Sequence, residues 1–319
     1  MPVDTLASDM QETRREVLSA LDGGPASGPD LAEDLGISRA AVWKHVEALR
    51  EAGFEIEAGE DGYTLAGLPE LGGAAVELGL EAPFEVEYHD SFPSTNDRAR
   101  DLAGEGREDV VVLADKQTGG RGRLDRAWAS PSGGVWLSLL VRPDVPPARA
   151  PLFTLAAAVA TARAARETGA EAAIKWPNDV LVSGRKLAGV LTEIDGEADR
   201  VSWLVVGVGV NANVDPGDIP GEAAATSLRA EVGDVDRRVL TQRLVEEFHA
   251  LRTDTDTVLP AWREHAATLG RRVRVETPGG EVVGEAVDVA SPGSLVVETA
   301  GGRVEVTAGD CEHLRPENR

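Results

Sequence analysis

The sequence predicts an α+β protein made of three successive folded parts. Near its start, stretches with helical apolar spacing are separated by short glycine turns and followed by two short strand-like runs. A long middle region has many strand-like runs joined by short turns, together with one long alanine-rich helix. Near the end, short alternating strands are separated by tight glycine turns. Helices and adjacent strands arranged in this way are typical of the α+β class.

Composition places the protein in a particular environment. The 319 residues carry 55 acidic and 32 basic side chains, a formal net charge of −23, and only four of the basic residues are lysines. Acidic surfaces nearly free of lysine suit a salt-rich cytosol, so we expect a halophilic source. One cysteine, Cys311, allows neither an internal disulfide nor a cysteine-based metal site. Without a secretory signal or an apolar run long enough for a bilayer, the sequence predicts a cytoplasmic protein with no membrane partner.

The first part, residues 1–67, has the pattern of a winged helix-turn-helix. A turn at Gly36 joins two helical stretches, Ser38 is a suitable cap for the second, and FEIEAGEDGYTLAG predicts a two-stranded wing. DNA binding would use basic side chains of the third helix, namely Arg39, Lys44 and His45. Residues 1–66, however, carry 14 acidic and 5 basic side chains. Because duplex affinity depends largely on phosphate neutralisation, an interpretation with protein contacts only stays open.

The remaining boundaries follow from changes in pattern. Residues 68–82 predict a linker, and residues 83–266 predict a mixed or antiparallel sheet with packed helices, including PLFTLAAAVATARAARETG. Residues 267–319 contain only short strands and tight turns, which predicts a small β-barrel of the SH3-like type.

A glycine-rich loop with three arginines, TGGRGRLDRAW at residues 118–128, is the first candidate for chemistry. Glycines let backbone N–H groups approach an oxyanion, and Arg121, Arg123 and Arg126 add permanent charge. The loop has neither the ending of a P-loop nor the spacing of a dinucleotide fingerprint. By itself it fits a solvated surface turn equally well.

Two further segments supply polar groups that suit an anion site. IKWPNDVLV places Asn178 and Asp179 in a turn between two apolar runs, although an ordinary capped turn has the same pattern. GRKLAGVLTE begins an apolar strand with Lys186, and Gly189 allows close approach to the backbone. A lysine at the start of a strand is often only an edge residue, but here it adds a fourth cation to the arginine loop.

In combination, GRGRLDRAW, KWPND, RKLAG and GVGVN closely resemble the motifs of the biotin protein ligases. The preceding winged helix makes the chain similar to the bifunctional type, which is both a ligase and a biotin operon repressor. The resemblance covers nearly the whole chain and implies ATP-dependent formation of biotinyl-5′-AMP, followed by transfer of biotin to a carrier lysine. It implies biotin as substrate, ATP with Mg²⁺, and as partners the biotin carboxyl carrier domain of an acyl-CoA carboxylase, operator DNA and a second copy of the chain.

The resemblance also assigns roles to individual residues. The catalytic set it implies is Lys186, Arg121, Arg123 and Asp179. The biotin-binding set it implies is Ser94, Thr95, Asn96, Gln117, Arg121, Gly122, Arg123, Lys186 and Gly189. The ATP or adenylate set it implies is Arg123, Arg126, Trp128, Asn178, Lys186 and Asn211. No protein side chain is expected to be a dedicated metal ligand.

Other functions remain to be tested against this one. The chain would otherwise be a ligase whose winged helix does not bind DNA, or a biotin-sensing transcription regulator without ligase activity. A relative acting on lipoate is disfavoured, because those proteins lack the paired GRGR and KWPND motifs.

Overall fold

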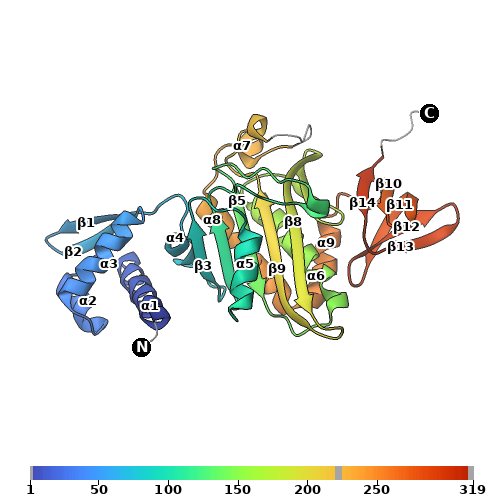
Figure 1. Cartoon of the computed structure of the whole chain (residues 1–319). Coiled ribbons are helices and arrows are strands. Elements are labelled where there is room, and N and C mark those ends of the chain that lie inside the picture. Colours follow the sequence, from blue (N-terminus) through green and yellow to red (C-terminus); the bar gives the residue numbers. More distant parts are fainter. Residues whose placement is uncertain (1–2, 220–224, 315–319) are drawn as a thin grey trace. The chain divides into compact units, whose positions relative to one another are not determined.

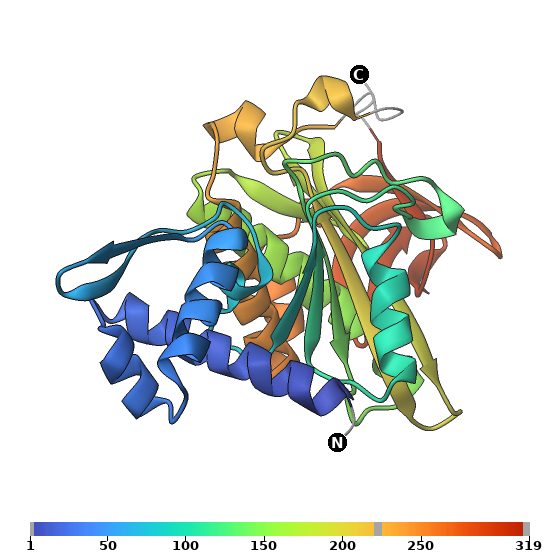
Figure 2. The ribbon, with the colours of Figure 1, turned by 60° about the vertical axis from the view of Figure 1, so that its left-hand side comes forward.

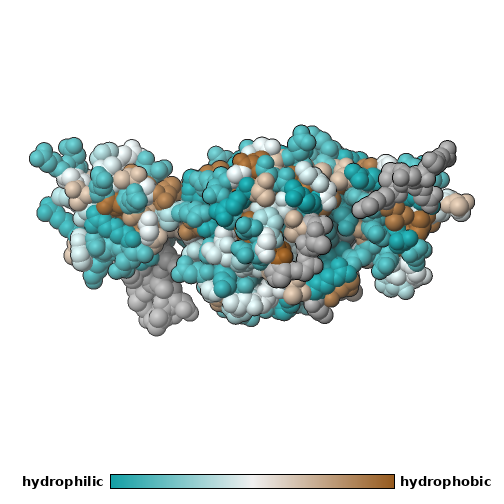
Figure 3. All heavy atoms as spheres, turned by 90° about the horizontal axis from the view of Figure 1, so that it is seen from above, coloured by the Kyte–Doolittle hydropathy of each residue, from teal (hydrophilic) through white to brown (hydrophobic). Residues whose placement is uncertain are grey.

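The computed structural model describes residues 3–219 and 225–314, and the chain folds into two compact units, Met1–Leu80 and Glu81–Arg319 (Figure 1). On the face drawn in Figure 3, hydrophilic side chains predominate and hydrophobic ones are scattered in small groups. None of the helices in the described ranges combines the length and hydropathy needed to cross a membrane.

The first unit contains the predicted helix-turn-helix and its wing. Its elements are α1 (Val3–Asp22), α2 (Gly28–Asp34), α3 (Arg39–Glu51), β1 (Glu55–Gly59), β2 (Gly62–Gly67) and α4 (Gly73–Glu77). Ser38 caps α3 by accepting from the Ala41 N–H at 3.1 Å, and Gly36 makes the turn before it with a φ of 64°. Val17, Val46 and Leu49 join one buried core beneath these helices. Strands β1 and β2 pair as an antiparallel hairpin, so the two-stranded wing is confirmed.

The second unit is built on a seven-stranded sheet. In sequence its strands are β3 (Glu85–His89), β4 (Val110–Ala114), β5 (Val135–Val141), β6 (Ala172–Lys175), β7 (Asp179–Val182), β8 (Arg185–Gly196) and β9 (Val201–Val210). Their spatial order is β3-β4-β5-β9-β8-β7-β6. Only the β3–β4 pair is parallel and the other pairs are antiparallel, which agrees with the predicted mixed sheet.

Helices cover both faces of this sheet (Figure 2). Helix α5 (Thr95–Gly104) packs on one face, where Ala99 and Leu102 meet Val110, Val112 and Leu140. On the other face lie α6 (Pro151–Glu167), α8 (Arg237–Thr253) and α9 (Val258–Glu264), while the short α7 (Leu228–Val232) follows β9. The alanine-rich α6 is buried along most of its length, because small side chains allow close packing against the sheet and α8.

The end of the chain forms a second antiparallel sheet. Its strands are β10 (Arg272–Thr277), β11 (Gly280–Ala290), β12 (Ser294–Thr299), β13 (Gly302–Val306) and β14 (Asp310–His313), in the order β13-β12-β11-β10-β14. The predicted closed barrel is not confirmed, since β13 and β14 are not paired with each other among the described residues. The two edge strands, β13 and β14, follow each other in sequence, but β14 pairs with β10 instead of with β13.

Trp176 joins the two sheets of the second unit. Its side chain is buried, its backbone N–H donates to Thr268 Oγ1 at 2.9 Å, and its indole Nε1 donates to the Gly293 carbonyl at 2.9 Å. His313 Nε2 lies 3.0 Å from the same Thr268 hydroxyl, and burial lowers the pKa of His313 to about 4. These contacts hold the start of the KWPND turn against the C-terminal sheet.

We expect Trp176→Phe to lower the free energy of unfolding of the second unit more than Trp262→Phe does. Both indoles are fully buried, but Trp262 Nε1 has no hydrogen-bond partner among the described residues. Only the change at Trp176 leaves the Gly293 carbonyl without its donor, which costs about 1–3 kcal/mol. Urea unfolding of the two variants measures the difference, and equal destabilisation would show that the bond to Gly293 contributes nothing.

Candidate functional site

A cleft lies on the face of the sheet that carries α5, at the end where β4 and β9 finish and β5 and β8 begin. It contains every predicted site residue of the second unit except Asn211. These are Ser94, Thr95, Asn96, Gln117, Arg121, Gly122, Arg123, Arg126, Trp128, Asn178, Asp179, Lys186 and Gly189. Segments as far apart in sequence as Ser94 and Asp310, the latter in the C-terminal sheet, thus converge on one cavity.

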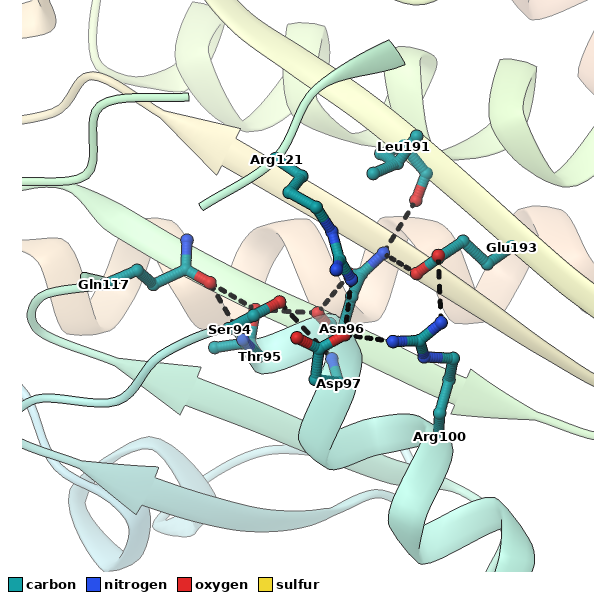
Figure 4. Close-up of polar contacts among 10 residues, drawn as sticks. Ser94, Thr95, Asn96, Asp97, Arg100, Gln117, Arg121, Leu191 and Glu193 are labelled. Atoms are coloured by element: carbon teal, nitrogen blue, oxygen red, sulfur yellow. Dashed lines mark hydrogen bonds and ion pairs between the residues drawn. The ribbon is translucent and has the colours of Figure 1, made fainter. Parts of the chain in front are cut away.

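The N-terminus of α5 forms a polar end of the cleft. Ser94 caps the helix by accepting from the Asp97 N–H at 3.3 Å. The backbone N–H and hydroxyl of Thr95 both donate to Gln117 Oε1, at 2.8 and 3.1 Å (Figure 4). Gln117 Nε2 donates to Ser130 Oγ at 3.0 Å. The Gln117 amide is thereby fixed in one orientation at the edge of the cavity.

Two side chains that the sequence analysis missed, Ser138 and Glu193, form hydrogen bonds with Asn96. Ser138 of β5 is fully buried, and its hydroxyl lies 2.6 Å from Asn96 Oδ1 and 2.7 Å from Thr95 Oγ1. Asn96 Nδ2 donates to Glu193 Oε2 of β8 at 2.7 Å. A lone serine in the apolar strand VWLSLLV was a usable signal for Ser138, because a buried hydroxyl needs a partner.

The arginine loop folds back on itself and rests on the C-terminal sheet. Gly122 N donates to the Arg126 carbonyl at 2.7 Å, and the short 3-10 turn η1 (Arg123–Asp125) forms its tip. Arg123 donates to Asn178 Oδ1 at 3.1 Å and to the Gly309 carbonyl at 3.0 Å. The loop is therefore tied to the KWPND turn and to the residue before β14.

Each cation of the cleft faces a carboxylate. Lys186 Nζ lies 3.1 Å from Asp179 Oδ1 across the β7–β8 pair. Arg121 forms an ion pair with Asp97 of α5, and Arg126 forms one with Asp310. The side chains in these pairs are partly exposed, so the pairs can exchange for other anions without opening a buried core.

Glycines on β8 and β9 make room for the groups above the sheet. Gly189 pairs directly with Gly209, and the Trp128 indole lies over both of them. A side chain at Gly209 would overlap Trp128 Nε1, and one at Gly207 would overlap the Asn96 amide. Lys186 Nζ lies 4.8 Å from the centre of the Trp128 ring, within the range of a cation–π contact.

Asn211 lies just outside the cleft. It is buried, and its Nδ2 donates to the Thr226 carbonyl at 3.0 Å. Its Oδ1 has no hydrogen-bond partner among the described residues. Its predicted part in adenylate binding therefore stays a prediction.

On α3 of the first unit, the predicted DNA-contacting residues point in different directions. Arg39 and Lys44 are exposed, and Trp43 between them is 55% exposed. His45 is only 7% exposed, and burial, with Arg14 nearby, lowers the pKa of His45. An inward imidazole is a poor phosphate ligand, whereas the exposed residues of α3 include Arg39, Trp43 and Lys44.

Comparisons with known proteins assign these parts. Residues 88–211 match the Biotin/lipoate A/B protein ligase family, residues 268–314 the Biotin protein ligase C terminal domain, and residues 13–64 an HTH domain. The chain is 37% identical to the bifunctional ligase/repressor BirA of Bacillus subtilis, over 96% of this chain and 99% of that protein. The chain belongs to the biotin protein ligase family. The resemblance inferred from its motifs is thereby confirmed.

Two further matches each cover part of this biotin protein ligase. The biotin–[acetyl-CoA-carboxylase] ligase of Mycobacterium tuberculosis is 38% identical over 68% of this chain and 84% of that protein. The biotin protein ligase from Aquifex aeolicus, solved in complex with biotin and ATP, has a TM-score of 0.59 and 28% identity, over 72% of this chain and 98% of that one.

Within residues 3–219 and 225–314, no group of three or more His, Cys, Asp or Glu side chains is arranged to hold a metal ion. The carboxylates that line the cleft are Asp179 and Asp310, each beside a cation. A divalent ion in this biotin protein ligase would accordingly need most of its ligands from a bound phosphate group.

We expect Gly207→Ala to destabilise the second unit by about 1–3 kcal/mol, the usual cost of overpacking. The added methyl overlaps Asn96, and that amide is already fixed by Ser138 and Glu193. Gly104→Ala is the matched control, because a methyl there has no neighbour within 4 Å among the described residues. Chemical unfolding that ranks Gly104→Ala as the more damaging change would contradict this packing.

Proposed function

We propose that this chain is an ATP-dependent biotin–protein ligase that also acts as a biotin-responsive transcriptional repressor. The ligase forms biotinyl-5′-AMP from biotin and ATP, releasing diphosphate, and then transfers biotin to a lysine of a biotin carboxyl carrier domain, releasing AMP. One observation carries this proposal: a polar end that suits a cyclic urea and a cluster of four cations share a single cleft. The names of the relatives, which pair ligase and repressor, support it.

The polar end of the cleft suits the ureido ring of biotin. A ureido group has a carbonyl acceptor between two N–H donors, and it needs complementary groups within apolar walls. Ser94, Thr95 and Gln117 provide hydroxyl and amide groups there, while Leu137 and Val190 line the cavity. We assign biotin recognition to this end of the cleft.

The cations at the other end suit the first reaction. A biotin carboxylate oxygen attacks the α-phosphorus of ATP, the bond to the bridging oxygen breaks, and diphosphate leaves. Two anions must be brought together and the charge developing on phosphorus must be stabilised, which Arg121, Arg123 and Lys186 do in our assignment. The substrate anions then replace Asp97 and Asp179 as partners of Arg121 and Lys186.

The second reaction needs a neutral amine beside the adenylate. The carrier lysine nitrogen attacks the acyl carbon, the bond from that carbon to the phosphate oxygen breaks, and AMP leaves. Asp179, the last residue of the KWPND turn, accepts the proton that the amine loses. Lys186, which the substrate has drawn away from Asp179, balances the charge on the departing phosphate.

The nucleotide would lie along the arginine loop. Trp128 provides a flat indole for the adenine, with Asn178 and Asn211 as further polar contacts and Arg126 for the phosphates. Mg²⁺ supplied with ATP shields phosphate charge and takes most of its ligands from phosphate oxygens.

We place the repressor function on the first unit and the enzyme in the cytosol of a halophile. The exposed Arg39 and Lys44 of α3 would contact operator DNA as part of a homodimer. The acidity of the chain supports a salt-rich cytosol, where surface charge is screened. The same acidity favours, as the second candidate, a ligase whose winged helix makes only protein contacts.

We expect biotin-dependent exchange of diphosphate into ATP, and we expect Lys186→Ala to slow it by about 10²–10³-fold, the usual cost of losing one transition-state contact. Lys116→Ala is the control, because Lys116 is exposed and does not line the cleft. Exchange is measured in high salt with thermal unfolding as a check on folding. Absence of exchange in folded wild-type protein would reject the ligase.

We expect the full-length protein to bind DNA upstream of biotin-synthesis genes more tightly when biotin and ATP are both present. Lys44→Ala should weaken that binding and reduce the slope of log affinity against log salt by about one. Arg303→Ala, an exposed arginine of the C-terminal sheet, is the control. DNA binding that does not depend on biotin and ATP, or no binding at all, would reject the repressor function without affecting the proposed ligase function.

A further inference from the structure

We propose that Glu193 is a positioning residue that sets the direction of the hydrogen bonds offered to the biotin ring. This inference rests on the proposed ligase function and concerns a residue that does not line the cleft. Glu193 lies on β8, two residues beyond Leu191, and reaches Asn96 from behind the cavity (Figure 4).

The carboxylate determines which way the Asn96 amide points. A carboxylate only accepts hydrogen bonds, so the group facing Glu193 Oε2 at 2.7 Å must be the Asn96 NH₂. The second NH₂ hydrogen faces the Leu191 carbonyl at 3.5 Å, which also only accepts. Asn96 Oδ1 must then point to Ser138, and the buried amide has one orientation.

This orientation passes to the residues that line the cleft. The Ser138 hydroxyl has a single hydrogen and lies 2.6 Å from Asn96 Oδ1 and 2.7 Å from Thr95 Oγ1, so when the Asn96 oxygen takes that hydrogen, Thr95 Oγ1 does not receive it. Gln117 directs its NH₂ to Ser130. Glu193 therefore decides, through Asn96 and Ser138, whether the Thr95 hydroxyl oxygen receives a hydrogen bond from behind or is left to accept one in the cleft, while Gln117 Oε1 is held separately by the Thr95 backbone N–H.

A second branch joins Glu193 to the arginine loop. Arg100 Nη1 lies 3.5 Å from Glu193 Oε1, and Arg100 also pairs with Asp97. Asp97 pairs with Arg121, the side chain proposed to meet the biotin carboxylate. Alternating charges thus link the ring-binding end of the cleft to its anion-binding end.

The chemical consequence is discrimination at the ureido carbon. With the network fixed, the cleft offers a defined set of donors and acceptors to a ring with one carbonyl between two N–H groups. 2-Iminobiotin has the same shape but carries a protonated imine where biotin has the carbonyl, so it donates where biotin accepts. A fixed network rejects it, because a misplaced donor leaves buried groups unpaired.

The test compares Glu193→Gln with wild-type protein in the exchange assay. A glutamine keeps the shape but presents both a donor and an acceptor, so the Asn96 amide is free to turn over. We expect the ratio of the Ki of 2-iminobiotin to the KM of biotin to fall at least tenfold, while the KM of ATP changes less than twofold. Asp195→Asn, which removes a charge from an exposed site on the same strand, should keep the wild-type ratio.

An unchanged ratio in folded Glu193→Gln would overturn the proposal. If that variant does not fold, Glu193→Asp and Ser138→Ala replace it. Glu193→Asp should keep the ratio of Ki to KM, because an aspartate only accepts hydrogen bonds. Ser138→Ala should lower that ratio, because it removes the hydroxyl that joins Asn96 to Thr95. The opposite ranking of these two would equally overturn it. Failure of the ligase assignment is distinguishable, since wild-type protein would then show no biotin-dependent exchange.

Discussion

The site depends on the antiparallel pairing of β8 with β9, which brings glycines together on one face of the sheet. Gly189 lies opposite Gly209, and Gly207 lies opposite Leu191. Because glycines have no side chains, the sheet leaves space at these positions for the Trp128 indole and the Asn96 amide. The same pairing brings Lys186, at the start of β8, to the end of the sheet where β4 gives way to the arginine loop. Any side chain larger than hydrogen there would fill the cleft from below.

The distribution of charge explains how a strongly acidic chain can have a cationic cleft above these glycines. The net charge of −23 belongs to the whole surface, while the cleft gathers its cations on one loop and one strand. Asp97, Asp179 and Asp310 hold those cations in place when no substrate anion does so. Because the pairs are partly exposed, substrate oxygens can take over the same positions with little desolvation cost. The C-terminal sheet takes part directly, through Asp310 and the Gly309 carbonyl.

The sequence was sufficient for the class of fold and for most residues of the cleft, because motifs with fixed local geometry specify both. Ser38 predicted a helix cap, and GRGR, KWPND and RKLAG predicted residues that share one cavity. Interactions between distant segments were not predictable: no local pattern indicates that Glu193 reaches Asn96 or that Asp310 meets Arg126. His45 was placed on the DNA face because it is polar, whereas its helical position turns it inward. The predicted SH3-like barrel is not confirmed, because β14 pairs with β10 and not with its sequence neighbour β13 among the described residues.

The proposed ligase function requires biotin and ATP to react with each other in this one cleft. The most direct measurement is mass spectrometry of what the protein retains after incubation with biotin, ATP and Mg²⁺ and removal of free small molecules. We expect biotinyl-5′-AMP, about one per chain, because side chains proposed to bind the ring, the acyl phosphate and the adenine line the same cleft. Retention of ATP or biotin without the adenylate, or of neither, would contradict it.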